Sequence, residues 1–322
     1  MRRWIGIVFI IVVIFGISGC SGEHPKEEAQ NKKRTIDMIV KMHRGDYWNT
    51  VKMGALVAAK EYNIQLNFKA PDSEDDIEGQ IQMVEDAITN KSDAIVLAAS
   101  DYMELGQAAD KAAFNGIPMI SLDADVASAR VETRIGANNY EAGQKVGQRL
   151  VDLLGQSGKI GVVSFVKGAY DEAERMEGLM DYISRFPAIK VMEVGYSGSE
   201  ESLASDITGK MIKTHNLDGI VTLNSVSSVG AARKVKELGL GGQIKLVTFD
   251  STPEIIELLQ EGTIQATLIQ NPFSNGYLAV QHAVEALDGR KVPERVETPT
   301  KMIDLDNMLW PENQKQLFPF VQ

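Results

Sequence analysis

From Ile36 onward, short runs rich in β-branched and apolar residues alternate with longer segments that carry apolar residues at helical spacing. In order along the chain, these strand-like and helix-like segments cover residues 36–40, 51–61, 64–68, 77–89, 94–97, 105–114 and 118–122. Strand–helix alternation of this kind predicts a parallel sheet covered by helices on both faces. We therefore expect an α/β fold.

The same alternation begins again in the second half of the chain. Its segments cover residues 159–165, 173–184, 191–194, 203–215, 219–223, 229–238 and 245–249, followed by a helical stretch at 275–287 and an extended segment near 300–304. No repeat is visible in the residues themselves. Two similar lobes are therefore predicted from the pattern alone.

The N-terminus has the three parts of a secretory signal: a basic start, an apolar run over residues 4–17, and Ser18-Gly19-Cys20. The run of 14 residues is short for a membrane span, which needs about 20 residues. Ile17 to Cys20 resembles a bacterial lipobox, so we expect a signal peptide over 1–19 and lipidation of Cys20. An uncleaved signal anchor is the alternative. Polar residues 20–34 are predicted to be a flexible tether.

Charge and cysteine content exclude several classes of protein. Beyond the predicted signal peptide, 31 basic residues face 44 acidic ones, a net charge of −13. Such a surface repels phosphate backbones, so nucleic acid is not an expected partner. Cys20 is the only cysteine, which excludes an internal disulfide framework and a multi-cysteine metal site.

The sequence lacks the common motifs for catalysis and cofactor binding. No two of the four histidines, His24, His43, His215 and His282, have metal-ligand spacing, and there is no nucleophile elbow, phosphate loop or dinucleotide fingerprint. We therefore predict no enzyme, no catalytic residues, no metal and no cofactor. A secreted enzyme using Asp123 and Asp250 as an acid/base pair is a minor alternative.

Ligands of open parallel sheets sit beyond the carboxyl ends of the strands. The segments expected there are 41–48, 99–102, 123–125, 137–140, 167–175, 224–228, 250–252 and 270–273. They are rich in aromatic residues, carboxylates and amides and include an arginine. Groups of this kind suit a neutral, polyhydroxylated ligand, because carboxylates and amides bridge hydroxyls and aromatic rings cover the C–H face of a sugar.

Several motifs occur in a characteristic order. They are Tyr47-Trp48 before Val51-x-x-Gly54, GIPMISLD at 116–123, IGANNYEAG at 135–143, Arg175-x-x-Gly178, Asn224 before Gly230, VTFDSTP at 247–253 and ATLIQNP at 266–272. With them, the chain from about Ile36 to Ile303 resembles the ribose/galactose-type branch of the type I periplasmic solute-binding proteins, relatives of the ligand domain of LacI-type repressors.

The resemblance implies two Rossmann-like lobes joined by a three-segment hinge near 137–138, 270–271 and 298–301. The expected N-terminal lobe comprises 35–137 and 271–298, the C-terminal lobe 138–270 and 299–306, and the tail 307–322.

The resemblance to this family also implies a sugar-binding site. Tyr47 and Trp48 would stack on the sugar ring. Hydrogen bonds to its hydroxyls would come from Asp123, Arg175, Asn224, Asp250 and Gln270, and further acceptors would be Asp46 and Asp171. Departures from the family pattern at Lys41, Ala99, Ala124 and Ser199 widen the expected ligand from ribose to a larger, modified or acidic sugar.

Structural alternatives exist for most of these residues. Tyr47 and Trp48 could cap the core, Asp123 and Asp250 could be caps, and Arg175 could be a surface ion-pair member. Asn224 is a natural N-cap, a role compatible with ligand binding.

The function implied is that of a monomeric, lipid-anchored protein on the outer face of the cytoplasmic membrane. It would capture a monosaccharide-like ligand between its lobes and deliver it to an ABC-type sugar permease. The alternative partner is a membrane sensor histidine kinase. A LacI-like regulator would need an N-terminal helix-turn-helix and a basic surface, where this chain has a signal sequence and a negative charge.

Overall fold

The computed structural model describes residues 33–317. The predicted signal peptide, the lipidation of Cys20 and most of the tether lie outside the described residues. Within them, no helix combines the length and the apolar character needed to cross a bilayer.

The first lobe is built on a six-stranded parallel sheet in the order β11-β5-β4-β3-β1-β2. Its strands are β1 (Thr35–Ile39), β2 (Gln65–Lys69), β3 (Ala94–Leu97), β4 (Met119–Leu122), β5 (Val131–Gly136) and β11 (Arg295–Glu297). One face packs on α1 (Asp46–Glu61) and α9 (Pro272–Leu287) through one apolar cluster. A second cluster joins the other face to α2 (Ile77–Thr89) and α3 (Glu104–Phe114).

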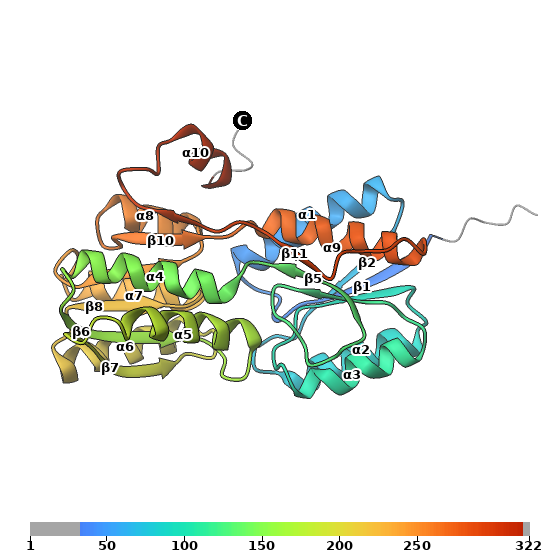
Figure 1. Ribbon diagram of the computed structural model, residues 1–322, viewed down its shortest axis with the longest axis horizontal. Coiled ribbons are helices and arrows are strands. Elements are labelled where there is room, and N and C mark those ends of the chain that lie inside the picture. Colours follow the sequence, from blue (N-terminus) through green and yellow to red (C-terminus); the bar gives the residue numbers. More distant parts are fainter. Residues whose placement is uncertain (1–32, 318–322) are drawn as a thin grey trace, which may run out of the picture. The chain divides into compact units, whose positions relative to one another are not determined.

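The second lobe repeats this order as β12-β10-β9-β8-β6-β7, with only β12 antiparallel. Its strands are β6 (Gly158–Ser164), β7 (Ile189–Tyr196), β8 (Gly219–Thr222), β9 (Lys245–Phe249), β10 (Ala266–Ile269) and β12 (Lys301–Ile303). Its helices are α4 (Asn139–Leu153), α5 (Tyr170–Ile183), α6 (Glu201–His215), α7 (Ser225–Glu237), α8 (Pro253–Gln260) and α10 (Pro311–Leu317). Figure 1 shows the sheet of this lobe with its flanking helices α4, α5, α6 and α7. The predicted fold class, two α/β lobes with helix-flanked sheets, is confirmed.

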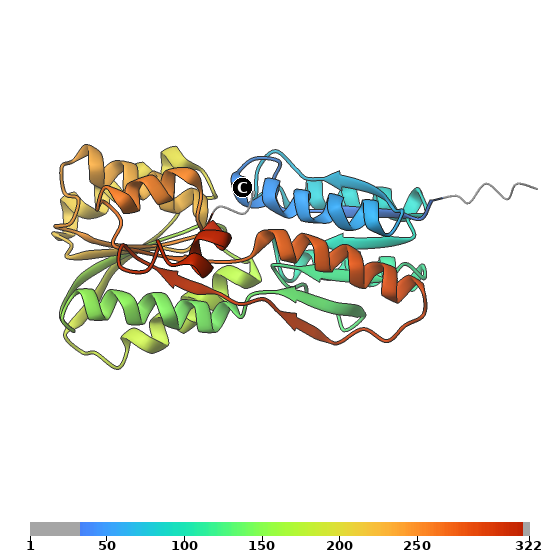
Figure 2. The same cartoon turned by 90° about the horizontal axis from the view of Figure 1, so that it is seen from above.

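The chain passes between the two sheets three times: from β5 to α4, from β10 to α9, and from β11 to β12. In Figure 2 these passages lie between the lobes. No bounds were predicted for β5, α4 and β10, although residues 137–140 and 270–273 were expected to follow strands. In β5, Glu132 and Arg134 interrupt the apolar run, so the strand does not read as a buried one. Helix α9 begins three residues before the predicted 275, because Asn271 caps it and Pro272 occupies its first turn.

Three pairs of helices touch backbone to backbone at glycines: α4 with α5, α1 with α9, and α6 with α7, where Gly230 meets Glu201. A Cβ atom on Gly178 of α5 would lie 2.0 Å from the carbonyl oxygen of Tyr140 in α4, and one on Gly143 would lie 2.1 Å from that of Arg175. Helices α1 and α9 of the first lobe, which lie side by side in Figure 2, meet in the same way at Gly54 and Gly276. Only glycine permits this approach, which sets the position of Arg175 relative to α4.

Gly178→Ala is expected to destabilise the protein by about 3 kcal/mol, because the new methyl group overlaps a backbone oxygen and the two helices must separate. That corresponds to a fall in melting temperature of about 6 °C for a chain of this size. Gly209→Ala is the matched control, since its Cβ would meet only the flexible side chain of Lys234 at 3.3 Å. Equal melting temperatures for the two variants would contradict the packing described.

Candidate ligand-binding site

Polar side chains from both lobes converge where the carboxyl ends of the two sheets face each other. The space left among them is about 30 Å³, room for about one water molecule. It is lined by Lys41, Met42, Arg44, Gly45, Tyr47, Trp48, Glu74, Asp123, Phe165, Asp171, Arg175, Asn224, Ser225, Val226, Asp250 and Gln270. We call this set the cleft site.

Asp123 and Asp250 occupy matching places in the two lobes. Asp123 directly follows β4 and Asp250 directly follows β9, strands that hold the same position in the two sheet orders. Both residues have left-handed backbone conformations, with φ of 65° and 72°. A left-handed aspartate is uncommon, and such conformations cluster at functional sites. The backbone N–H of each aspartate donates a hydrogen bond to the neighbouring strand. That of Asp123 donates to the carbonyl oxygen of Ile135, and that of Asp250 to the carbonyl oxygen of Leu268.

Arg175 lies in the first half of α5 and is only 2% exposed. Its Nε donates to Oδ1 of Asn139 at 2.9 Å, and its Nη1 donates to the carbonyl oxygen of Leu223 at 2.8 Å. The guanidinium carbon lies 4.6 Å from the ring centre of Phe249, a cation–π contact. These contacts fix the guanidinium and contradict the alternative of a surface ion pair.

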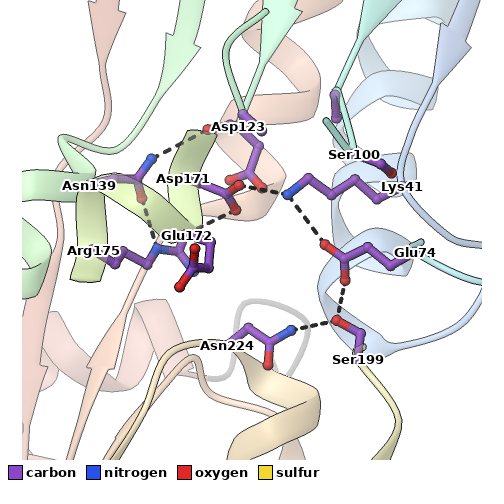
Figure 3. Close-up of polar contacts among 12 residues, drawn as sticks. Lys41, Glu74, Ser100, Asp123, Asn139, Asp171, Glu172, Arg175, Ser199 and Asn224 are labelled. Atoms are coloured by element: carbon purple, nitrogen blue, oxygen red, sulfur yellow. Dashed lines mark hydrogen bonds and ion pairs between the residues drawn. The ribbon is translucent and has the colours of Figure 1, made fainter. Parts of the chain in front are cut away.

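Lys41 follows β1 and is among the largest fully buried side chains of the described residues. Its ammonium contacts Oδ1 of Asp171 at 2.7 Å and Oε1 of Glu74 at 3.3 Å (Figure 3). Lys41 and Glu74 belong to the first lobe and Asp171 to the second, so the ion pair with Asp171 crosses between lobes. Because both carboxylates pair with Lys41, its positive charge is already neutralised within the protein.

Two further contacts join the lobes beside Lys41. The hydroxyl of Ser199 in the second lobe donates to Glu74, and it also accepts a hydrogen bond from Nδ2 of Asn224 at 2.9 Å. Arg44, at the exposed rim, pairs with Glu200 at 2.9 Å. Asn224 also caps α7 by accepting from the backbone N–H of Ser227. Its structural role and its place in the cleft site therefore coexist, as predicted for an N-cap.

The aromatic pair at the start of α1 borders both the core and the cleft. Trp48 is 6% exposed, and its ring meets that of Tyr47 edge to face at 5.2 Å. The hydroxyl of Tyr47 donates to Oδ1 of Asp123. On the hinge, Gln270 donates from Nε2 to Asp250 at 2.8 Å, and its Oε1 faces Arg175 at 3.4 Å. Tyr47 and Gln270 therefore hold the two matching aspartates in place.

Burial raises the pKa values of three carboxyl groups in the cleft site, those of Asp250, Asp123 and Glu74. Desolvation is the largest cause for Asp250, whose pKa rises to about 6 although the Arg175 charge and the Gln270 hydrogen bond oppose the shift. Desolvation also raises the pKa of Asp123, and the charge of Asp171 adds to this effect. The pKa of Glu74 is raised by burial against the opposing charge of Lys41. The site therefore holds more negative charge than its own cations stabilise.

Asp250→Asn is expected to raise the free energy of unfolding more at pH 7.5 than at pH 4. The two changes are expected to differ by about 2–3 kcal/mol. A carboxyl with a raised folded-state pKa contributes stability below its unfolded pKa near 4, and that contribution is lost as the pH rises through about 6. Asparagine keeps the oxygen that accepts from Gln270 and has no such loss. Melting curves at the two pH values measure the difference, with Asp46→Asn as the control. A pH-independent difference would contradict the raised pKa.

Of the nine residues predicted to bind ligand, eight line the cleft site. They are Tyr47, Trp48, Asp123, Asp171, Arg175, Asn224, Asp250 and Gln270. Asp46 does not: it is exposed on the first residue of α1 and lines a neighbouring hollow. Asp250 does not cap α8, because Thr252 does so.

Glu74 and Phe165 also line the cleft site and Asn139 supports Arg175, and none of the three was predicted as a site residue from the sequence. Phe165 follows β6 directly, so its position at a strand end was a signal for it. Glu74 lies among the acidic residues of 72–76, which resemble a solvated turn. Within residues 33–317, no group of three or more His, Cys, Asp or Glu side chains is placed to hold a metal ion.

Comparison with known families gives one match that covers most of the chain. The family model described as periplasmic binding protein domain matches residues 36–291. Among curated proteins, the ribose import binding protein of Bacillus subtilis is 23% identical over 308 residues, which cover 94% of this chain and 99% of that protein.

Two solved structures are similar over nearly their whole length. A sugar transporter from Clostridium phytofermentans is 33% identical, with a TM-score of 0.79 over 84% of this chain and 99% of that one. An ABC transporter solute-binding protein from Agrobacterium vitis, solved with bound D-fucose, is 29% identical, with a TM-score of 0.86 over 88% and 99% of the two chains.

Proposed function

The chain belongs to the periplasmic binding protein family, and on that premise we propose that it captures a neutral monosaccharide-like solute between its lobes for an ABC-type sugar permease. The observation that carries the proposal is the cleft site itself. Two matching aspartates, a fixed arginine and two amides, drawn from both lobes and the hinge, meet at the carboxyl ends of the strands. This is a set of acceptors and donors for the hydroxyls of one small ring.

The charges of the cleft site favour a neutral sugar over an acidic one. Away from the rim, four carboxylates, those of Glu74, Asp123, Asp171 and Asp250, face the two cations Lys41 and Arg175. An acidic sugar was one of the ligands that the sequence left open, beside a larger or modified one, and the cation of Lys41 was among the reasons. Asp171 and Glu74 already neutralise that cation. A ligand carboxylate would therefore enter a site with excess negative charge, where repulsion is weakly screened.

Capture requires the lobes to move. With only about 30 Å³ between them, the facing side chains leave no room for a monosaccharide, so the lobes part to admit it. The three strand passages are the natural hinge, and they support the predicted lobe boundaries at 137–138, 270–271 and 298–301. A ligand that contacts Asp123 on one side and Arg175 on the other favours closure, and the closed form is the one a permease would recognise.

The partner and the anchor follow from relatives and from the N-terminus. The solute-binding relatives of B. subtilis and A. vitis are named for import or ABC transport, which supports a permease as the partner. Lipidation of Cys20 would hold the protein at the outer face of the membrane, with residues 21–34 as the tether. We propose that it acts there as a monomer, without catalysis.

A thermal-shift screen of protein starting at Ser21 tests this function. Pentoses, hexoses and polyols are each compared with the corresponding uronic or aldonic acid at the same concentration. Ligand in hundredfold excess over its Kd stabilises the folded protein by about 2.7 kcal/mol. We expect neutral sugars to raise the melting temperature more than their acids. A larger shift from an acid would overturn the charge argument, and no shift from any compound would overturn monosaccharide capture.

A further inference from the structure

A second and larger hollow lies beside the cleft site, at the exposed rim between the lobes. It has a volume of about 540 Å³, within the range of about 300–1,000 Å³ that is typical of small-ligand pockets. Met42, Arg44 and Gly45 of the first lobe form one wall, and residues of the second lobe at the start of α6 and on α7 form the other. We call this hollow the outer groove.

The outer groove is continuous with the cleft site. Four residues line both hollows, namely Met42, Arg44, Gly45 and Val226. Gly45 has a φ of 97°, and a Cβ atom on it would meet no described residue within 4 Å except its chain neighbours. Ser199 lines the groove and hydrogen-bonds to Glu74 and Asn224 of the cleft site (Figure 3). A group attached to a ring in the cleft site can therefore extend into the groove.

The charged side chains that line the outer groove are paired, in contrast to those of the cleft site. Arg44 pairs with Glu200 across the lobes at 2.9 Å. Arg233 on α7 pairs with Glu201 at 2.5 Å, and also with Glu254 on α8. Each carboxylate that lines the groove therefore has an arginine beside it. A neutral polar group can enter the groove without meeting an uncompensated charge.

Hydroxyl groups and apolar side chains form the remaining walls of the outer groove. Ser202 and Ser205 lie in the first turns of α6, and their hydroxyls have no hydrogen-bond partner within residues 33–317. A hydroxyl can both donate and accept, as the hydroxyls of a sugar do. Met42 and Val226 offer apolar surface to C–H groups. This combination of free hydroxyls and apolar surface suits a neutral sugar ring.

The floor of the outer groove is rigid, because α6 and α7 pack closely beneath it. A Cβ atom on Gly230 of α7 would lie 2.3 Å from the carbonyl oxygen of Glu201 in α6, and both residues line the groove. The helices cannot approach further, and the groove is formed before any ligand enters. Binding to a preformed pocket avoids the cost of ordering its walls.

We propose that the outer groove is a second sugar subsite, and that the captured solute is a neutral disaccharide with one ring in the cleft site and the other in the groove. This inference rests on the proposed sugar capture and narrows its ligand class. A free monosaccharide would fill the cleft site alone and bind more weakly. Closure of the lobes is compatible with the longer ligand, because the groove lies at the exposed rim beside Arg44 and Glu200.

Calorimetric titration of protein starting at Ser21 tests the second subsite. D-Galactose is compared with lactose and melibiose, D-glucose with maltose and cellobiose, and D-xylose with xylobiose. We expect at least one disaccharide to bind at least about tenfold more tightly than its monosaccharide, because the second ring adds hydrogen bonds in the groove. Monosaccharides that bind as tightly as all their disaccharides would overturn the subsite and leave monosaccharide capture standing. A panel without any binding also overturns the subsite, and the thermal-shift screen of free monosaccharides then decides the proposed function separately.

Substitutions at Ser205 test where the second ring lies. Ser205→Tyr places a ring in the outer groove, and Ser205 does not line the cleft site. It is expected to weaken disaccharide binding at least about tenfold and to leave monosaccharide binding unchanged. Ser205→Ala adds no bulk and is expected to weaken disaccharide binding about two- to tenfold, as for loss of one neutral hydrogen bond. Thr214→Tyr, at an exposed position on the same helix, is the matched control and is expected to change neither affinity.

Melting temperatures establish that each variant is folded. Disaccharide binding that is unchanged in both Ser205 variants would overturn the second subsite. Equal losses for monosaccharide and disaccharide in folded Ser205→Tyr would overturn it as well, because the groove would then not be specific to the second ring.

Discussion

Arg175→Ala is expected to weaken binding of the captured sugar by at least about 100-fold. Hydrogen bonds from a charged group contribute about 1.5–3 kcal/mol each, so two such bonds from the guanidinium to the sugar correspond to about 100-fold or more in affinity. The substitution also leaves Asn139 and the carbonyl of Leu223 without their partner and removes the nearest positive charge from Asp250. Calorimetric titration with the sugar found in the screen measures the loss.

Loss of folding must be separated from loss of the contact. Arg175→Lys keeps the charge but not the planar fork, so it is expected to fold and still bind weakly. Arg185→Ala, at an exposed position after the same helix, is expected to bind like the natural protein. If Arg175→Lys and Arg175→Ala both bound with unchanged affinity, Arg175 would not be a ligand contact.

Lys41→Met is expected to destabilise the protein by about 3–5 kcal/mol at pH 7.5. Removing one partner of a buried ion pair leaves an uncompensated charge, and here two carboxylates, Asp171 and Glu74, lose the same ammonium. Without it, the pKa of Glu74, already raised by burial, loses the opposing charge of Lys41 and rises further. The deficit is therefore expected to shrink as the pH falls toward 4.5, where Glu74 takes up a proton. Denaturant titration at the two pH values measures it.

The triple variant Lys41→Met, Glu74→Gln, Asp171→Asn removes the charges together and is expected to recover most of the lost stability. Lys190→Met, at an exposed site on β7, is expected to have little effect at either pH. A Lys41→Met protein with natural stability at pH 7.5 would show that the cross-lobe ion pair contributes nothing.

The residues that could be predicted from the sequence are those that follow a strand directly. Asp123, Asp250 and Gln270 each come immediately after a buried run, and the parallel topology carries all such positions to the same cleft. The fold class was also predictable, because the alternation of strands and helices is a local pattern. It can be recognised without knowing which residues of the two lobes are in contact. Short strands with charged residues, such as β5, were not visible in that pattern.

What the sequence could not show is which distant side chains pair. Lys41 was placed at a strand end, but its partner Asp171 lies 130 residues away, and only the approach of the two lobes brings them together. Asp46 and Tyr47 show the limit at short range. They are neighbours in the first turn of α1, yet consecutive helical residues point about 100° apart. Tyr47 therefore faces the cleft, whereas Asp46 faces solvent.

The central claim is that the two matching aspartates and Arg175 bind a neutral sugar between the lobes. Calorimetric titration of the best sugar from the screen into the natural protein, Asp250→Asn and Asp46→Asn tests it most directly. Asp250→Asn is expected to be at least as stable as the natural protein, so a loss of binding in it is not a loss of folding. We predict saturable binding to the natural protein and to Asp46→Asn, and binding at least about tenfold weaker in Asp250→Asn, as expected for loss of one charged hydrogen-bond acceptor. Equal affinity in all three proteins would contradict the account.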